Sequence, residues 1–202
     1  MSPTRRALLR GAIPPVLGLS GCLNSQDRRT ARTQSRSGSV SDPEVEKPRN
    51  PEDGPVVVEA ADGSRISGEL VTDGSRVEEL TFHPDVPDAD VESARGFLEA
   101  TDFDEETVYI TQRGIRSCYR LRVESVSWEP RRVEYEYCRE LRPPDVRCEA
   151  DRRESLGLLF RLPAALDMRI TGRGSSGRSP CRNVDTEYER IEVDGNATAE
   201  AE

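Results

Sequence analysis

The chain has 202 residues and a formal net charge of −9, with 34% hydrophobic and 33% charged side chains. This length suits one ordinary domain with tails. Lys47 is the only lysine, so arginine supplies nearly all of the positive charge. An acidic, lysine-poor composition of this kind keeps a protein hydrated in concentrated salt, and it bears on solubility rather than on fold.

The first 22 residues have the layout of an export signal with a lipid attachment site. Arg5 and Arg6 stand in a short segment that matches every position of the twin-arginine signal. The apolar run after it is far shorter than the ~20 residues that span a bilayer. The Leu-Ser-Gly-Cys motif that ends at Cys22 resembles a lipobox, whose cysteine is lipidated and begins the mature chain. We therefore predict a signal peptide over 1–21 and a protein held by lipid on Cys22 at the extracellular face of the cell membrane.

The next stretch is polar. Val40 and Val45 are its only large apolar residues after Leu23. Such a segment buries too little surface to offset the entropy of ordering it. We predict a disordered tether over 22–54, which would hold the domain roughly 30 Å from the membrane.

A folded β-domain is predicted over 55–193. Runs of β-branched residues separated by Asp-Gly turns are typical of hairpins, and they occur at 56–58, 65–71 and 77–82. The apolar spacing then becomes helical, which predicts a helix over 88–100 with Asp88 as its N-cap. A further strand is predicted over 107–111.

The clearest strand pattern lies between the cysteines at 118 and 138. Apolar residues alternate with charged ones over 119–124 and again over 133–137, which predicts two half-buried strands. A register that sets Val123 opposite Val133 aligns both apolar rows. The same register brings Cys118 opposite Cys138.

Four cysteines remain besides Cys22, namely Cys118, Cys138, Cys148 and Cys181. In an exported chain they predict two disulfides, whereas a zinc site would need close ligand pairs that this spacing does not offer. The register favours Cys118–Cys138 with Cys148–Cys181. A second pairing, Cys138–Cys148 with Cys118–Cys181, stays open.

The last part of the chain has a weaker pattern. We predict strands over 156–162 and 166–170, a flexible loop over 172–177, an edge strand over 188–193 and an acidic tail over 194–202. Together these elements give about eight strands and one helix. The expected fold class is mainly β, as a β-sandwich or a partly open barrel.

No catalytic residue, metal site or cofactor is predicted. The G-x-G-x-x-G pattern at 172–177 lacks the helix that must follow it in a dinucleotide site. His83 is the only histidine, and no nucleophile motif accompanies it. Asn196 begins a possible N-glycosylation sequence in the tail.

Three acidic residues have the alternating spacing of a calcium loop: Asp102, Asp104 and Glu106. The glycine and the bidentate glutamate that such a loop requires are missing from its sixth and twelfth positions. We therefore interpret these three acidic residues as part of the turn that ends the helix. Weak calcium binding by them stays open.

Charge is unevenly spread along the chain. Residues 41–112 hold 20 acidic and 5 basic residues, whereas 113–182 hold 16 arginines and 10 acidic residues. A basic segment after an acidic one can mark a nucleic-acid face. In an exported protein we expect instead that the two segments pair with each other, or that the basic one meets an anionic surface partner.

The leader and the lysine-poor, acidic composition resemble those of twin-arginine lipoproteins of halophilic archaea. The layout of central strands and cysteines is similar to such proteins as well, in Asp102-Phe103, Val108-Tyr109-Ile110, Cys118-Tyr119-Arg120-Leu121 and Tyr137-Cys138. The resemblance implies no activity, and so it assigns no functional residue.

The function that fits these observations best is a non-catalytic surface module that binds a protein or a glycan, and no nucleic acid. The alternative is a solute-binding or carrier lipoprotein, which a deep apolar pocket with a few polar groups would indicate. A carboxylate-based hydrolase is a third hypothesis, and it would need carboxylates gathered in a cleft.

Overall fold

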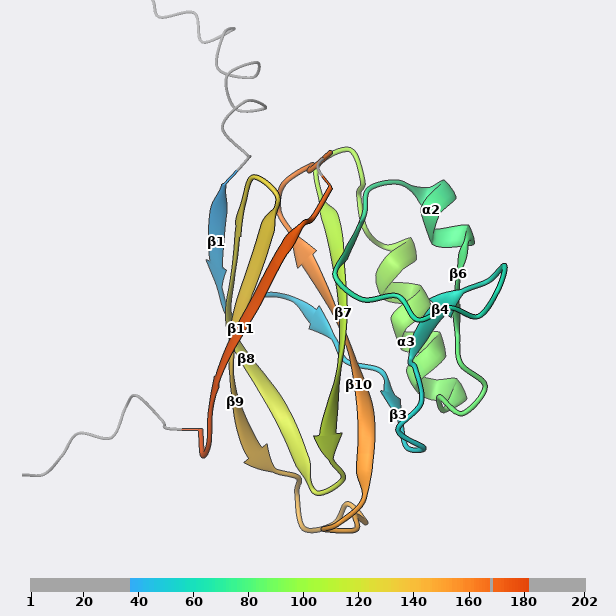
Figure 1. Ribbon diagram of the computed structural model, residues 1–202, viewed down its shortest axis with the longest axis vertical. Coiled ribbons are helices and arrows are strands. Elements are labelled where there is room, and N and C mark those ends of the chain that lie inside the picture. Colours follow the sequence, from blue (N-terminus) through green and yellow to red (C-terminus); the bar gives the residue numbers. More distant parts are fainter. Residues whose placement is uncertain (1–36, 168, 182–202) are drawn as a thin grey trace, which may run out of the picture.

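The computed structural model describes residues 37–167 and 169–181. They form a mainly β domain in which two sheets face each other, and helices with a short third sheet cover the outer face of one of them (Figure 1). The predicted mainly β, sandwich-like fold is confirmed, and so is the helix near 88–100.

The first sheet has the strand order β1-β8-β9-β11. Its strands are β1 (Gly38–Ser41), β8 (Tyr119–Glu129), β9 (Arg132–Leu141) and β11 (Gly172–Arg178). β8 and β9 form a long antiparallel hairpin, β1 pairs antiparallel with β8, and β11 runs parallel to β9.

The second sheet has the order β2-β10-β7-β5, and β3 also pairs with β10. Its strands are β2 (Val45–Glu46), β3 (Arg49–Asn50), β5 (Glu69–Val71), β7 (Thr107–Arg116) and β10 (Arg153–Leu162). β7 and β10 are long central strands, and where both of their faces are covered the apolar residues are consecutive, at 108–110 and 158–160.

Hydrophobic side chains of the second sheet are buried on both of its faces. Leu158 and Phe160 of β10 pack between the two sheets, against Tyr135 and other residues of the first sheet. Leu159, on the opposite face, packs against Leu98 in the outer layer. The interior between the sheets is therefore occupied by side chains along most of its length.

The outer layer contains two helices and the short third sheet. Its elements are β4 (Val57–Glu59), α2 (Gly74–Glu78), β6 (Leu80–Phe82) and α3 (Asp88–Glu99). Buried Ala94 and Leu98 turn α3 toward the second sheet. The spacing of apolar residues four apart along the helix accounts for this packing.

The helix boundaries differ from the prediction in two places. Pro87, and not Asp88, is the N-cap of α3, and Asp88 lies in the first turn, where the helix dipole favours an acidic side chain. The sequence does not predict α2. Asp73 caps it by accepting a hydrogen bond from the Arg76 amide at 2.9 Å, so the strand predicted over 77–82 begins only at β6.

The predicted tether over 22–54 is wrong in its C-terminal part. β1, β2 and β3 lie within it and pair with β8 and β10. Val40 and Val45 pack against the core between the sheets. Edge strands are held largely by backbone hydrogen bonds, so a stretch with few apolar residues still joins a sheet. Residues 1–36 lie outside the described part.

The predicted flexible loop over 172–177 is instead strand β11. Its backbone pairs with β9 along its whole length. Its glycines permit close packing, because a Cβ on Gly174 would collide with Glu134 and one on Gly177 would collide with the ring of Tyr137. The pattern of glycine and serine that indicated a loop is here a requirement of strand pairing.

The strand predicted over 166–170 does not form in the residues of that stretch that the structure describes. Leu166 is buried in the core, and its amide donates a hydrogen bond to Thr107 Oγ1 at 2.9 Å. The edge strand predicted over 188–193 and the tail over 194–202 lie outside the described residues.

The hairpin of β8 and β9 forms as predicted but in another register. Trp128, which the prediction places in the connecting loop, lies inside β8 opposite Val133. A bulge after Val123 then keeps both apolar rows directed inward. The longer strands move Cys138 away from Cys118, so the register on which the disulfide prediction rests is wrong.

Candidate functional site: an arginine-lined groove

Several site residues predicted from the sequence lie outside the described part of the chain. These are Arg5, Arg6, Cys22 and Asn196, so export, lipidation and glycosylation stay predictions. Among the described residues, no helix has the length and apolar character needed to cross a membrane.

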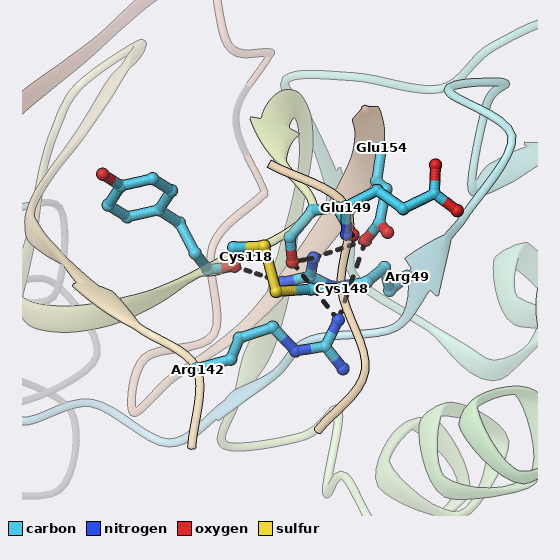
Figure 2. The surroundings of a disulfide bond; sticks show 8 residues. Arg49, Cys118, Arg142, Cys148, Glu149 and Glu154 are labelled. Atoms are coloured by element: carbon cyan, nitrogen blue, oxygen red, sulfur yellow. Dashed lines mark hydrogen bonds and ion pairs between the residues drawn. A yellow bond between two sulfur atoms is a disulfide. The ribbon is translucent and has the colours of Figure 1, made fainter. Parts of the chain in front are cut away.

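The other four cysteines form two disulfides, in the third possible pairing. Cys118 bonds to Cys148, and Cys138 bonds to Cys181, so both pairings weighed from the sequence are wrong. The loop after β9 returns Cys148 to the turn between β7 and β8 (Figure 2). Cys138 on β9 meets Cys181 because β11 runs beside β9 and ends next to it.

A buried ion pair lies beside the Cys118–Cys148 disulfide (Figure 2). Arg49 Nη1 is 2.5 Å from Glu154 Oε2, and the two side chains are only 15% and 7% exposed. Arg49 Nη2 also donates to the Tyr119 carbonyl at 2.8 Å. These contacts tie the N-terminal strands to the disulfide, so this cluster is a structural junction.

Some arginines of the basic segment pair with carboxylates of the acidic one, as we expect from the charge distribution. Arg161 Nη1 is 2.8 Å from Glu44 Oε1, and Arg152 Nη2 is 2.5 Å from Glu52 Oε1. The Arg161 guanidinium also lies 4.4 Å from the centroid of the Phe97 ring. This part of the positive charge is neutralised within the molecule.

A second set of arginines lines a groove along the edge of β7, beside β9 and β11. The groove consists of two cavities of about 350 and 380 Å³ that share Arg113. We call it the arginine groove, and its cations are Arg113, Arg116, Arg139, Arg153 and Arg173. No Asp or Glu is among the described residues that line either cavity.

Arg113 stands at the centre of the groove because β7 alternates its side chains between two faces. Buried Ile115, two residues further on, packs in the core between the sheets, which places Arg113 on the same inward face. The Arg113 guanidinium lies 4.1 Å from the centroid of the Tyr137 ring, and its Nη1 is 3.5 Å from the Tyr135 hydroxyl. These contacts position the cation without neutralising it.

At one end of the groove two arginines lie directly opposite each other. Arg116 of β7 and Arg153 of β10 are cross-strand partners, and like charges at such positions repel. Asp53 approaches Arg153 Nε only to 3.8 Å. Neither Arg116 nor Arg139 forms an ion pair with a described residue. A bound anion would relieve this repulsion.

At the other end Arg173 of β11 closes the groove. Its Nη1 donates to the Ser67 carbonyl at 2.5 Å. Gly68, with φ +79°, leaves room for this guanidinium, since a Cβ there would collide with it. Burial raises the pKa of Tyr109, so its hydroxyl stays protonated beside the groove and remains a hydrogen-bond donor.

The chemistry of this groove suits an anionic ligand. Guanidinium groups keep their charge at any pH that proteins tolerate and bind carboxylate, sulfate or phosphate through paired hydrogen bonds. Their long-range field extends ~10 Å at 0.1 M salt and only ~3 Å at 1 M. In concentrated salt the groove therefore acts through direct contact with its ligand.

The other residues weighed from the sequence are not brought into a site. His83 Nδ1 is 3.2 Å from Asp85 Oδ2 and 3.5 Å from Asn50 Nδ2 at the surface end of the outer layer. Asp102 accepts a hydrogen bond from the Asp104 amide at 3.1 Å, in the turn after α3. Within 37–167 and 169–181, no cluster of three His, Cys, Asp or Glu residues could hold a metal ion.

Sequence reasoning finds the basic segment but not the groove. The excess of arginine after position 113 is visible in the sequence, yet the register of β7 with β10 decides which arginines share a cavity. The one usable signal is local. β7 is buried from Thr107 to Gln112 and then continues as Arg-Gly-Ile-Arg, which places cations at the end of a core strand.

Comparisons of the chain with protein families, with curated protein sequences and with solved structures find no match.

Proposed function

We propose that this chain is an exported, lipid-anchored surface protein whose β-domain binds an anionic partner, a protein or a glycan, in the arginine groove without catalysing a reaction. The observation that carries the proposal is a set of three arginines, Arg113, Arg116 and Arg139, which line one cavity together with Arg153 and form no ion pair with a described residue. Repulsion within such a set is costly, and an anionic ligand offsets it.

The leader supports the location. Arg5, Arg6 and Cys22 have the order and spacing of an export signal followed by a lipid attachment site. The described domain begins at Ser37, 15 residues after Cys22. A chain of that length reaches at most about 50 Å when fully extended, so the domain would stay close to the membrane surface.

The groove favours a binding module over a small-ligand carrier. A carrier pocket is expected to be mostly apolar with a few polar groups. Here the two cavities are lined largely by arginine, tyrosine and serine, and the interior between the sheets is filled by side chains. A hydrolase would use carboxylates in the cleft, and no described lining residue supplies one.

The location is tested by two substitutions in the leader. Cys22→Ala should release the protein into the medium, whereas retention in the membrane fraction would refute lipid anchoring. Replacing Arg5 and Arg6 by lysine should block export, and normal surface levels would rule out the twin-arginine route.

The binding function is tested with acidic polymers. Polyglutamate and polygalacturonate should bind the wild-type protein, and the affinity should fall as salt rises. The double variant Arg116→Gln/Arg139→Gln should bind at least about 10-fold more weakly, because two charge-assisted contacts are lost. Arg147→Gln is a matched control, since Arg147 is exposed and does not line the groove. Equal binding by all three proteins would refute the proposal.

A further inference from the structure

An edge of strand β7 that no described strand covers lines the arginine groove at Gly114. On one side β7 pairs with β10 over its whole length, from Thr107 to Arg116. On the other side β5 pairs only with Val108 to Ile110. In the described part of the chain, no strand pairs with this side of β7 from Gln112 onward.

The alternation of hydrogen bonds shows which backbone groups face that edge. Gly68 N donates to the Ile110 carbonyl at 2.8 Å, so Ile110 directs its backbone groups away from β10. Residues two apart on a strand direct their backbone to the same side, so Gln112, Gly114 and Arg116 do likewise. The Gln112 amide donates a hydrogen bond to Ser67 Oγ at 3.4 Å. The Gly114 amide and carbonyl face the groove, and no strand among the described residues pairs with them.

Gly114 lines the groove together with the cations on both faces of β7. It lacks a side chain, and a Cβ there would lie 2.7 Å from Arg153 Nη2, so this guanidinium lies directly over the edge. Arg113 lies on the inward face, where Arg139 also lines the cavity. Arg116 and Arg153 lie on the opposite face. A strand added here would therefore have two arginines beside each of its faces.

We propose that the occupant of the groove is an extended acidic peptide segment of a partner protein, which adds to the free edge of β7 at Gln112–Arg116. This inference rests on the proposed function and narrows it from an anionic partner to an acidic peptide. The edge is about 13 Å long at ~3.3 Å per residue, which suits a segment of about five residues.

Two observations favour a peptide over an acidic glycan. The main-chain donor and acceptor of Gly114 are of the kind that a peptide backbone satisfies in strand addition. The arginines above and below the edge are spaced as the alternating side chains of a paired strand, so successive Asp or Glu residues would find cations on either face. Arginines on a free edge also discourage pairing with apolar strands and thus select for an acidic one.

The test uses hexaglutamate as the probe and the full chain purified in detergent. Binding is followed by fluorescence anisotropy of the labelled peptide, and exchange of the Gly114 amide is followed by hydrogen–deuterium exchange. We expect saturating peptide to slow exchange at Gly114 at least 10-fold. A hexaglutamate with alternate amides N-methylated keeps its charge but loses strand hydrogen bonds, and it should bind at least 10-fold more weakly.

Equal binding of the two peptides, or unchanged exchange at Gly114, would overturn strand addition while leaving the proposed anion binding intact. Binding of polygalacturonate that depends on Arg116 and Arg139, without binding of the peptide, would have the same meaning. If neither polymer binds, the proposed function fails as well. If hexaglutamate binds only to a chain truncated after Arg182, the chain's own acidic residues 183–202 are the occupant, and the proposal of a separate partner is wrong.

Discussion

Two groups of arginines in this molecule have opposite surroundings. Arg49, Arg76 and Arg161 each contact at least one carboxylate at 2.5 to 2.8 Å, and the pairs of Arg49 and Arg161 join elements far apart in the sequence. Arg113, Arg116 and Arg139 in the arginine groove form no ion pair with a described residue. The same side chain thus holds the fold together in one region, whereas in the other no described carboxylate pairs with it.

The difference shows that the number of arginines in a chain does not tell which of them form internal ion pairs and which could bind a ligand. Arg76 alone contacts Glu59, Glu69 and Glu79, and these carboxylates raise the pKa of its guanidinium further above its ordinary value. The charge and the hydrogen-bond donors of such an arginine are already used by carboxylates of the protein, so it is poorly suited to bind an anionic ligand. The comparison can be tested by removing members of each group in turn.

The largest effect is expected at Arg49. Arg49→Met leaves Glu154 buried, with Arg142 3.9 Å away as its nearest remaining partner. Breaking a buried pair in this way costs about 3–5 kcal/mol. The free energy of unfolding can be measured by chemical denaturation with the fluorescence of Trp128, the only tryptophan.

Arg152→Met is the matched control for Arg49, since its partner Glu52 is 61% exposed and such pairs contribute about 0.2–1 kcal/mol. If Arg49→Met costs no more than this control, the junction beside the disulfide is not a main support of the fold. The double variant Arg49→Met/Glu154→Leu should recover most of the loss, because no buried charge remains unpaired.

A smaller loss is expected at Arg161, which joins β10 to the end of α3. Arg161→Ala removes the pair with Glu44, the contact with the Phe97 ring and a hydrogen bond to the Phe97 carbonyl at 2.8 Å. We expect a loss of about 1–3 kcal/mol in the free energy of unfolding. Arg169→Ala at an exposed position should stay within about 0.5 kcal/mol, and an equal loss there would contradict the assignment.

The pairing of Arg76 predicts a modest pH dependence. Its hydrogen bond to Glu59 lowers the pKa of that carboxyl below its ordinary value of 4.5. The contribution is fully present above pH 4.5 and is lost as the pH falls through the lowered value, because the folded state then takes up a proton. Glu59→Gln should therefore reduce stability near neutral pH by about 0.2–1 kcal/mol and flatten its decline below pH 4.5.

The control for this prediction is Glu78→Gln, at an exposed position beside the same cluster. Its stability should follow the wild-type curve against pH. A decline in Glu59→Gln as steep as in the wild type would show that the Arg76 cluster does not contribute in this range.

The smallest change in stability is expected in the groove itself. Arg116→Gln removes one of two opposed cations, so the free energy of unfolding should stay unchanged or rise by up to about 0.5 kcal/mol. The gain should shrink as salt rises, since screening already weakens the repulsion. A loss above about 1 kcal/mol would mean that Arg116 supports the fold as Arg49 does.

Much of the fold could be predicted from the sequence, because it follows from local periodicity. The spacing of apolar residues identifies α3, and alternation identifies the β8–β9 hairpin. The disulfide pairing and β11 could not be predicted, since both depend on which strands become neighbours. The register of the hairpin depends on whether Trp128 belongs to a strand or to the turn, and its position between Ser127 and Glu129 fits either.

The groove was beyond prediction for a related reason. Arg116 and Arg153 are 37 positions apart, and only the antiparallel register of β7 with β10 sets them opposite each other. The uncovered edge at Gly114 likewise results from β5 being only three residues long. Patterns of residue types indicate which segments form strands, but they do not tell where a neighbouring strand stops.

Under the proposed lipid anchoring, the position of β1 would set the orientation of the domain relative to the membrane. The chain enters at Gly38, opposite Trp128, whereas Arg139 in the groove lies opposite Leu121 near the other end of β8 (Figure 1). Trp128 is seven positions beyond Leu121 on β8, a span of about 23 Å. Under the proposed anchoring, the membrane would lie beyond the Gly38 end, and the Arg139 end of the groove would point outward. It would then be presented to molecules arriving from the medium rather than to the lipid headgroups below.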